Sequence, residues 1–248
     1  MNTLFERLPI GHGWSETISA VAFTLLLATS PALAQAEHYK GMCEASAAVA
    51  LDAQHFIAGD DESNVLRIYR LGQPMPVGPP VDLSTFLDTA DKASDIEGAA
   101  RIGDTIYWIS SHSRTSAGKS RPWRHRLFAT RIDSSVSPPT VHPVVRPYVD
   151  LIKEMRSARE LDGLHIGSAA DLAPEAPGGL NIEGLAATPY GRLLVGFRNP
   201  LREGRALVVP LDNPAELLAG KSARPVFGRP ALLDLGGRGI RSMERMGA

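Results

Sequence analysis

A strand-rich unit recurs along this chain, and the recurrence restricts the folds that the sequence can adopt. The clearest copy is Lys92–Ile132, which opens with the acidic sequence DIEG and contains two β-rich segments, Thr105–Ser110 and Leu127–Ile132. Three further copies of the unit begin with a glutamate close to small residues. The four glutamates that head these units are Glu44, Glu97, Glu183 and Glu244.

The spacing of these glutamates predicts several strands per unit. The intervals are 53, 86 and 61 residues, and the long middle interval contains Tyr148–Glu175, where Leu151, Ile152 and Met155 recur at helical intervals. Without that segment the units have a period of roughly 50 to 60 residues, slightly longer than known propeller repeats. We therefore predict an all-β, β-propeller-like fold with one inserted helix.

The last unit is short of residues, because only four follow Glu244. A closed ring is what protects the edges of propeller blades. The sequence therefore predicts an incomplete, C-terminally truncated propeller-like domain over residues 35–248. The alternative is that partner chains complete the ring.

The N-terminal residues 1–34 have the pattern of a signal peptide. Ile18–Ala28 is an apolar run too short to span a bilayer, and Ala32-Leu33-Ala34 supplies a small-x-small cleavage pattern. We expect a periplasmic or secreted protein with no membrane span after cleavage. The single Cys43 excludes an internal disulfide, so the exported domain depends on packing alone.

Composition and motif searches exclude several functions. The net charge of −1 gives no general attraction to nucleic acid. The basic run Arg114–Arg126 surrounds Trp123, but export makes nucleic acid an unsuitable partner, and a solvated hairpin tip explains the run. The sequence has no G-x-S-x-G, no Walker phosphate loop and no H-E-x-x-H, which argues against serine hydrolases, nucleotidases and zinc enzymes.

Several separated motifs, in order, carry a family resemblance: CEASAAVAL, DDESNVLRIYRL, DIEGAARIGDTIYWISSHSR, NIEGLA, GFRNPL and GIRSMER. Together they resemble the domain-of-unknown-function family 3616, over about Gly41–Glu244. The resemblance implies a propeller-like exported protein without an assigned activity. More distantly, the Glu-Gly starts are similar to those of esterase-like phytases and other calcium-dependent propellers, which is a similarity of architecture and weak evidence for chemistry.

The four glutamates are the candidate metal ligands. If each heads the innermost strand of a blade, Glu44, Glu97, Glu183 and Glu244 converge at one mouth of the central channel. Converging carboxylates repel one another unless a hard cation such as Ca²⁺ or nearby arginines neutralise them. Two alternatives stay open at this point: the glutamates lock blades together through backbone hydrogen bonds, or they act as catalytic acids or bases.

Two residues are candidates for contact with a ligand or substrate. His112 follows a strand in SSHSR, and Arg198 occupies the corresponding point of GFRNP. Together they would form a pocket for a small anion such as a phosphate or carboxylate.

The favoured function is a binding or scaffold module with a carboxylate-lined channel mouth. The alternatives are a calcium-dependent hydrolase of phosphoesters or carboxylic esters, and an inactive fragment of such a protein. The sequence leaves open whether the protein is an enzyme.

Overall fold

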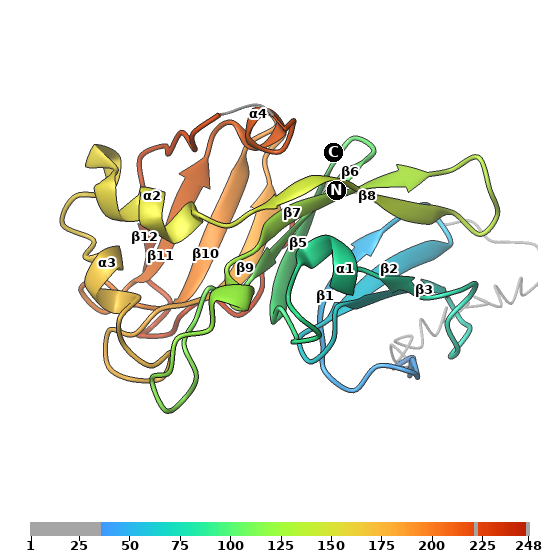
Figure 1. The fold of residues 1–248 in the computed structure, drawn as a ribbon, viewed down its shortest axis with the longest axis horizontal. Coiled ribbons are helices and arrows are strands. Elements are labelled where there is room, and N and C mark those ends of the chain that lie inside the picture. The colour runs from blue at the N-terminus through green and yellow to red at the C-terminus, as the bar shows by residue number, and fades with distance from the viewer. Residues whose placement is uncertain (1–35, 221–222, 247–248) are drawn as a thin grey trace, which may run out of the picture. The chain divides into compact units, whose positions relative to one another are not determined.

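Three four-stranded antiparallel sheets follow one another along the chain (Figure 1). The computed structural model describes residues 36–220 and 223–246, and Glu37–Ala248 is one compact unit. The predicted signal peptide lies outside the described residues. In each sheet the strands are hydrogen-bonded in chain order, so each sheet is an up-and-down blade.

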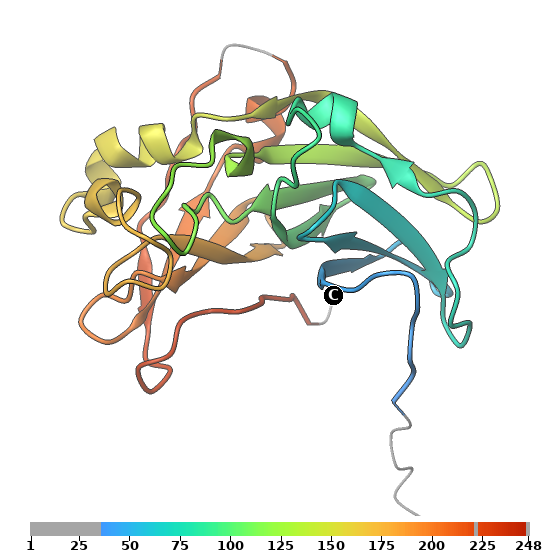
Figure 2. The same cartoon turned by 60° about the horizontal axis from the view of Figure 1, so that its bottom comes forward.

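Blade 1 contains β1 (Ala45–Ala50), β2 (His55–Asp60), β3 (Val65–Arg70) and β4 (Val81–Asp82). Blade 2 contains β5 (Ile96–Ile102), β6 (Thr105–Ser110), β7 (Leu127–Asp133) and β8 (Thr140–Tyr148). Blade 3 contains β9 (Asn181–Ala187), β10 (Leu193–Asn199), β11 (Ala206–Leu211) and β12 (Ala231–Leu233). The first strands of the blades, β1, β5 and β9, are neighbours in space (Figure 2).

Blade 2 is buried on both faces, which explains the composition of its second strand. Ile106 and Trp108 of β6 belong to the core shared with blade 1, where Trp108 stacks on Phe128 with ring centroids 6.3 Å apart. Tyr107 and Ile109 belong to the core shared with blade 3. Because successive side chains of a strand point to opposite faces, a strand between two cores is apolar throughout.

The glycines that follow Glu97 and Glu183 permit close packing between blades. A Cβ on Gly98 would lie 3.0 Å from the Cβ of Leu185 on β9 and 3.1 Å from the backbone nitrogen of Leu185. A Cβ on Gly184 would lie 2.7 Å from Ile240. A side chain at Gly98 would push β5 away from β9, and a side chain at Gly184 would push β9 away from the segment around Ile240.

The predicted helical insertion between blades 2 and 3 is present and is broken into short pieces. It forms α2 (Leu151–Ser157), a 3₁₀ turn (Arg159–Leu161) and α3 (Ile166–Ala169), and its apolar side chains join the core between blades 2 and 3. The remaining helices are α1 (Ser84–Leu87), α4 (Pro214–Leu217) and a 3₁₀ turn at Pro122–Arg124.

The predicted all-β, propeller-like class is therefore confirmed, whereas truncation of the domain stays a prediction. None of the helices within residues 36–220 and 223–246 has the length and apolar character needed to cross a membrane.

Candidate metal centre

Three carboxylates meet where the first strands of blades 1 and 2 begin. Asp61 directly follows β2, Asp95 directly precedes β5, and Glu97 is the second residue of β5. One oxygen from each lies within 4.8 Å of the other two. We call Asp61, Asp95 and Glu97 the acidic triad.

The position of the triad follows from the pairing of neighbouring strands. The Asp61 amide donates to the Glu44 carbonyl at 3.1 Å, just as the Ser111 amide donates to the Asp95 carbonyl at 2.9 Å. In both blades the second strand therefore ends beside the start of the first. The β1–β2 hairpin of blade 1 therefore brings Asp61 close to the start of blade 2, which supplies the other two acids.

Burial and mutual repulsion raise the pKa values of these carboxyl groups. Burial, followed by the charges of Asp95, Glu183 and Asp61, raises the pKa of Glu97 from 4.5 to about 8. Burial and the neighbouring acids raise the pKa of Asp61 from 3.8 to about 6. Among the described residues, no hydrogen bond or ion pair reaches the carboxylate of either residue, and Asp61 Oδ1 is a buried atom without a partner.

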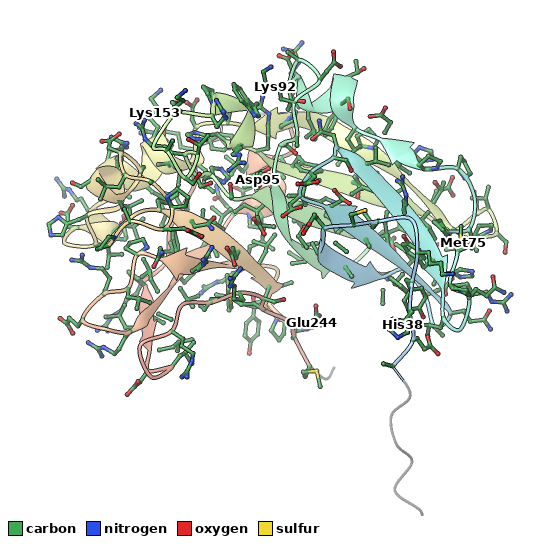
Figure 3. All side chains as sticks on the ribbon, turned by 90° about the horizontal axis from the view of Figure 1, so that it is seen from below. His38, Met75, Lys92, Asp95, Lys153 and Glu244 are labelled. Atoms are coloured by element: carbon green, nitrogen blue, oxygen red, sulfur yellow. The ribbon has the colours of Figure 1, made fainter. Side chains whose placement is uncertain are left out.

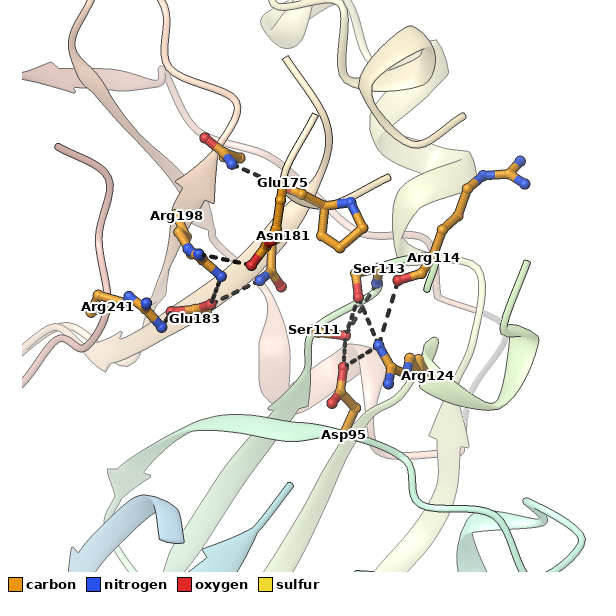
Figure 4. A network of polar contacts seen from close by, with 12 residues as sticks. Asp95, Ser111, Ser113, Arg114, Arg124, Glu175, Asn181, Glu183, Arg198 and Arg241 are labelled. Atoms are coloured by element: carbon orange, nitrogen blue, oxygen red, sulfur yellow. Dashed lines mark hydrogen bonds and ion pairs between the residues drawn. The ribbon is translucent and has the colours of Figure 1, made fainter. Parts of the chain in front are cut away.

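Asp95 differs because it has partners (Figure 4). It accepts a short hydrogen bond from the Ser111 hydroxyl and pairs with Arg124 at 3.0 Å. Arg124 also donates to Ser113 Oγ at 3.1 Å. Burial raises the pKa of Asp95, while Ser111 and Arg124 act in the opposite direction. One arginine against three carboxylates leaves the triad with an excess of two negative charges when all three are ionised.

Glu183 of blade 3 lies close enough to raise the pKa of Glu97 but is neutralised by its own partners (Figure 4). Its carboxylate accepts from Asn181 at 2.8 Å and pairs with Arg198 at 3.2 Å and with Arg241 at 3.1 Å. Arg198 also pairs with the exposed Glu175 at 3.3 Å. Glu183 is 4% exposed, whereas the side chains of Arg241 and Glu175 are largely exposed, so the network balances two arginines against two glutamates, of which only Glu183 is buried.

Of the four predicted glutamates, the structure brings Glu97 and Glu183 into one electrostatic neighbourhood. Glu44 is exposed and stands outside the triad, although its charge contributes to the raised pKa of Asp61. Glu244 lies elsewhere. It lines a pocket of about 490 Å³ formed at the opposite ends of β1, β5 and β9, and Figure 3 shows it well separated from Asp95.

The strand register explains why Glu44 and Glu244 do not join the others. Pairing with the second strand places Ser46 of β1 at the position that Glu97 occupies in β5. Near the C-terminus, the Ile240 amide donates to the Phe197 carbonyl at 3.0 Å, and Ile240 is buried like Ile182. The residue after this isoleucine is Arg241, not Glu244.

Residues 154–248 match the family model described as "Protein of unknown function (DUF3616)". The predicted resemblance to this family is confirmed over these residues, and its predicted extension to Gly41 stays a prediction. Glu183, Arg198 and Arg241 lie inside the matched segment of family 3616, whereas the acidic triad precedes it. No curated protein matches the chain.

Solved structures show only distant likeness. Two crystal structures of the extracellular domain of BT4673 from B. thetaiotaomicron are each 12% identical to this chain, with TM-scores of 0.31 and 0.32. They cover 67% and 69% of this chain, which spans 14% and 15% of theirs. A luciferin-regenerating enzyme is 10% identical with a TM-score of 0.26, covering 75% of this chain and 61% of its own. Such low scores support no inference about function.

His112 is buried beside His125. It is 1% exposed, its Nδ1 lies 2.8 Å from the Ser110 carbonyl oxygen, and its ring stacks on His125 at 5.5 Å. Burial, followed by the charge of His125, lowers the pKa of His112 to about 3, so the ring is neutral at physiological pH. The predicted pairing of His112 with Arg198 as an anion pocket gains no support from these contacts.

Sequence reasoning missed Asp61 and Asp95 as candidate ligands, although signals for both exist. Asp95 stands two residues before Glu97 in the DIEG start, and Asp61 lies in the polar cluster that ends β2. The missing information was which hairpin end adjoins which blade start.

Proposed function

We propose that Glu37–Ala248 is a cation-binding module that holds a divalent ion, Ca²⁺ by preference, at the acidic triad. The observation that carries this proposal is the approach of three carboxylates within 4.8 Å with Arg124 as the one cation paired to them among the described residues. A divalent ion would neutralise the remaining two negative charges.

The donor atoms favour a hard ion. The triad offers carboxylate oxygens only, which suit Ca²⁺ or Mg²⁺, whereas zinc sites are built largely from Cys and His. Ca²⁺ accepts six to eight oxygens in flexible geometry, so solvent or further protein oxygens would complete its shell. Among the described residues, Asn181 Oδ1 at the start of β9 is a buried oxygen without a partner and is one candidate for such a ligand.

The alternative, in which Glu97 locks blades together, requires hydrogen bonds from backbone amides to its carboxylate. None is present within residues 36–220 and 223–246. The bond that does join blades 1 and 2 at this point runs from the Ser46 hydroxyl to the Ile96 carbonyl. Glu97 is therefore available for an ion in a way that Glu183, with three side-chain partners, is not.

Calorimetric titration of the metal-free protein with Ca²⁺ and with Mg²⁺ tests the proposal. Native protein and Glu244→Gln should bind Ca²⁺ equally, because Glu244 lies at the other end of the inner strands. Glu97→Gln and Asp61→Asn should each weaken binding at least tenfold, since each removes one charged ligand. Binding that survives both substitutions would refute the site.

We further propose export to the periplasm or the cell exterior, supported by the signal-peptide pattern of residues 1–34. Mass spectrometry of the protein recovered after expression with its native N-terminus should find a chain that begins at Gln35. An uncleaved chain retained in the cytoplasm would contradict export.

A further inference from the structure

A concave region lies beside blade 2 and is lined by none of the acidic triad residues. It consists of two adjoining pockets of about 520 and 380 Å³, which share Asp88, Arg126 and Val149. We call this region the rim groove. Its walls contain apolar and basic side chains, which include Phe86, Lys92, Trp123, Arg126, Arg146 and Val149.

One wall of the rim groove is a strained loop held in place by an arginine. Asp88, Ala90 and Asp91 have φ values of 50°, 50° and 61°, a left-handed conformation that non-glycine residues adopt at a cost. The buried Arg126 guanidinium donates to the carbonyls of Leu87 at 2.7 Å and Asp88 at 3.0 Å. Strain of this kind persists where the surroundings fix the backbone, and it is concentrated at ligand sites.

Over the part of the chain that the structure describes, the cations in the rim groove, and Arg121 beside it, have no acidic partner at ion-pair distance. Lys92 Nζ lies 5.3 Å from the centre of the Trp123 ring, and the Arg121 guanidinium lies 4.9 Å from the same centre. In the described part of the chain, no carboxylate oxygen comes within the 4.0 Å ion-pair distance of Lys92, Arg121 or Arg146. The aromatic ring positions two cations without neutralising them.

The balance of charge in the groove is positive. Lys92, Arg126 and Arg146 line it, and among the described residues Asp88 is the one acidic residue in its walls. Arg126 uses most of its donors on backbone carbonyls, so it contributes positive potential more than free hydrogen bonds. The exposed side chains of Lys92 and Arg146 donate no hydrogen bond within residues 36–220 and 223–246, and apolar side chains lie in the same walls.

We propose that the rim groove binds a small organic dianion, with carboxylates or similar groups at Lys92 and Arg146 and a ring or apolar body against Val149, Phe86 and Trp123. The volume suits a small molecule. An extended peptide fits less well, because the neighbouring edge strand β8 contains Pro143 and Pro147, which have no amide hydrogen to pair with an added strand. The groove contains no residue of the acidic triad, so this proposal is independent of the cation site.

Calorimetry in the presence of a chelator tests the proposal with three probes: terephthalate, digalacturonate and the neutral terephthalamide. At least one dianion should bind, and the diamide should not. Terephthalate binding alone identifies an aromatic ligand class, and digalacturonate binding alone identifies an acidic sugar. Failure of both dianions, or equal binding of the diamide, would overturn the proposal.

Variants connect binding to the groove. Lys92→Gln and Arg146→Gln should each weaken dianion binding about tenfold, because each removes a charge-assisted contact. Both side chains are exposed, so folding should be unaffected. Lys153→Gln is the matched control, since Lys153 lies on α2 and pairs with Asp150, outside the groove. Unchanged affinity in the Lys92 and Arg146 variants, or equal weakening by Lys153→Gln, would contradict the assignment.

Discussion

Replacement of Glu97 by glutamine should stabilise the metal-free protein at alkaline pH. In the unfolded chain Glu97 loses its proton near pH 4.5, whereas in the folded protein it does so near pH 8. Between these values the folded state binds more protons than the unfolded state, so stability falls as the pH rises from 4.5 to 8. Glutamine resembles the protonated acid and removes this dependence.

The size of the effect follows from the pKa shift. A shift from 4.5 to about 8 corresponds to about 5 kcal/mol at 1.36 kcal/mol per pH unit. Glu97 is only partly buried, and solvent access reduces the difference to about 2–4 kcal/mol. At pH 8 in chelator, Glu97→Gln should therefore be more stable than the native protein by this amount. At pH 4.5 the two should agree within about 1 kcal/mol.

Urea unfolding followed by circular dichroism, at pH 4.5 and pH 8, measures both differences. Saturating Ca²⁺ should restore the stability of the native protein at pH 8 and have little effect on the variant. Glu244→Gln serves as the control, because its exposed side chain lies away from the triad. Equal stability of native protein and Glu97→Gln at pH 8 without metal would refute the reasoning.

Three further predictions test the same account. Ca²⁺ affinity should rise about tenfold per pH unit between pH 6 and 8 and level off above pH 8, because Glu97 must lose its proton before it can bind the ion. Calorimetry in buffers of different ionisation enthalpy measures the number of protons released on binding. Arg198→Ala should cost about 1–3 kcal/mol by leaving buried Glu183 with fewer partners, whereas Arg241→Ala, whose side chain is 72% exposed, should cost less than about 1 kcal/mol in urea unfolding. Gly98→Ala should lower stability by about 1–3 kcal/mol because its Cβ would clash with β9, and thermal melting measures this loss.

Each of these predictions has a clear contrary result. A Ca²⁺ affinity independent of pH would mean that no proton leaves the site. Equal losses for Arg198→Ala and Arg241→Ala would mean that burial does not govern the Glu183 network. A Gly98→Ala variant as stable as the native protein would show that the inner strands of blades 2 and 3 have room to separate.

Much of the fold was predictable because its signals are local. The strand Thr105–Ser110 was predicted with its bounds, and Leu127–Ile132 was one residue shorter than β7. Turn residues and continuous apolar runs are sufficient for such assignments. The insertion was predicted as a single helix, but Ala158 adopts an extended conformation and divides it. That interruption depends on packing against the blade core, which helical periodicity does not describe.

The site was less predictable, because its geometry depends on register. Matching units by their glutamates aligned Glu44 and Glu244 with Glu97, whereas strand pairing aligns Ser46 with Glu97. A buried isoleucine precedes Glu97, Glu183 and Arg241, but Ala45 precedes Ser46. A pattern of acidic residues alone does not reveal a shift of two or three residues. A shift of one residue already moves a side chain to the other face of a strand.

The most direct test of the cation site is an anomalous difference map from crystals of the protein grown with Mn²⁺, which binds the same oxygen ligands and is easily located. The account predicts a peak within coordination distance of one carboxylate oxygen each from Asp61, Asp95 and Glu97. A map without a peak between these three side chains, at an ion concentration that saturates binding in solution, would contradict it.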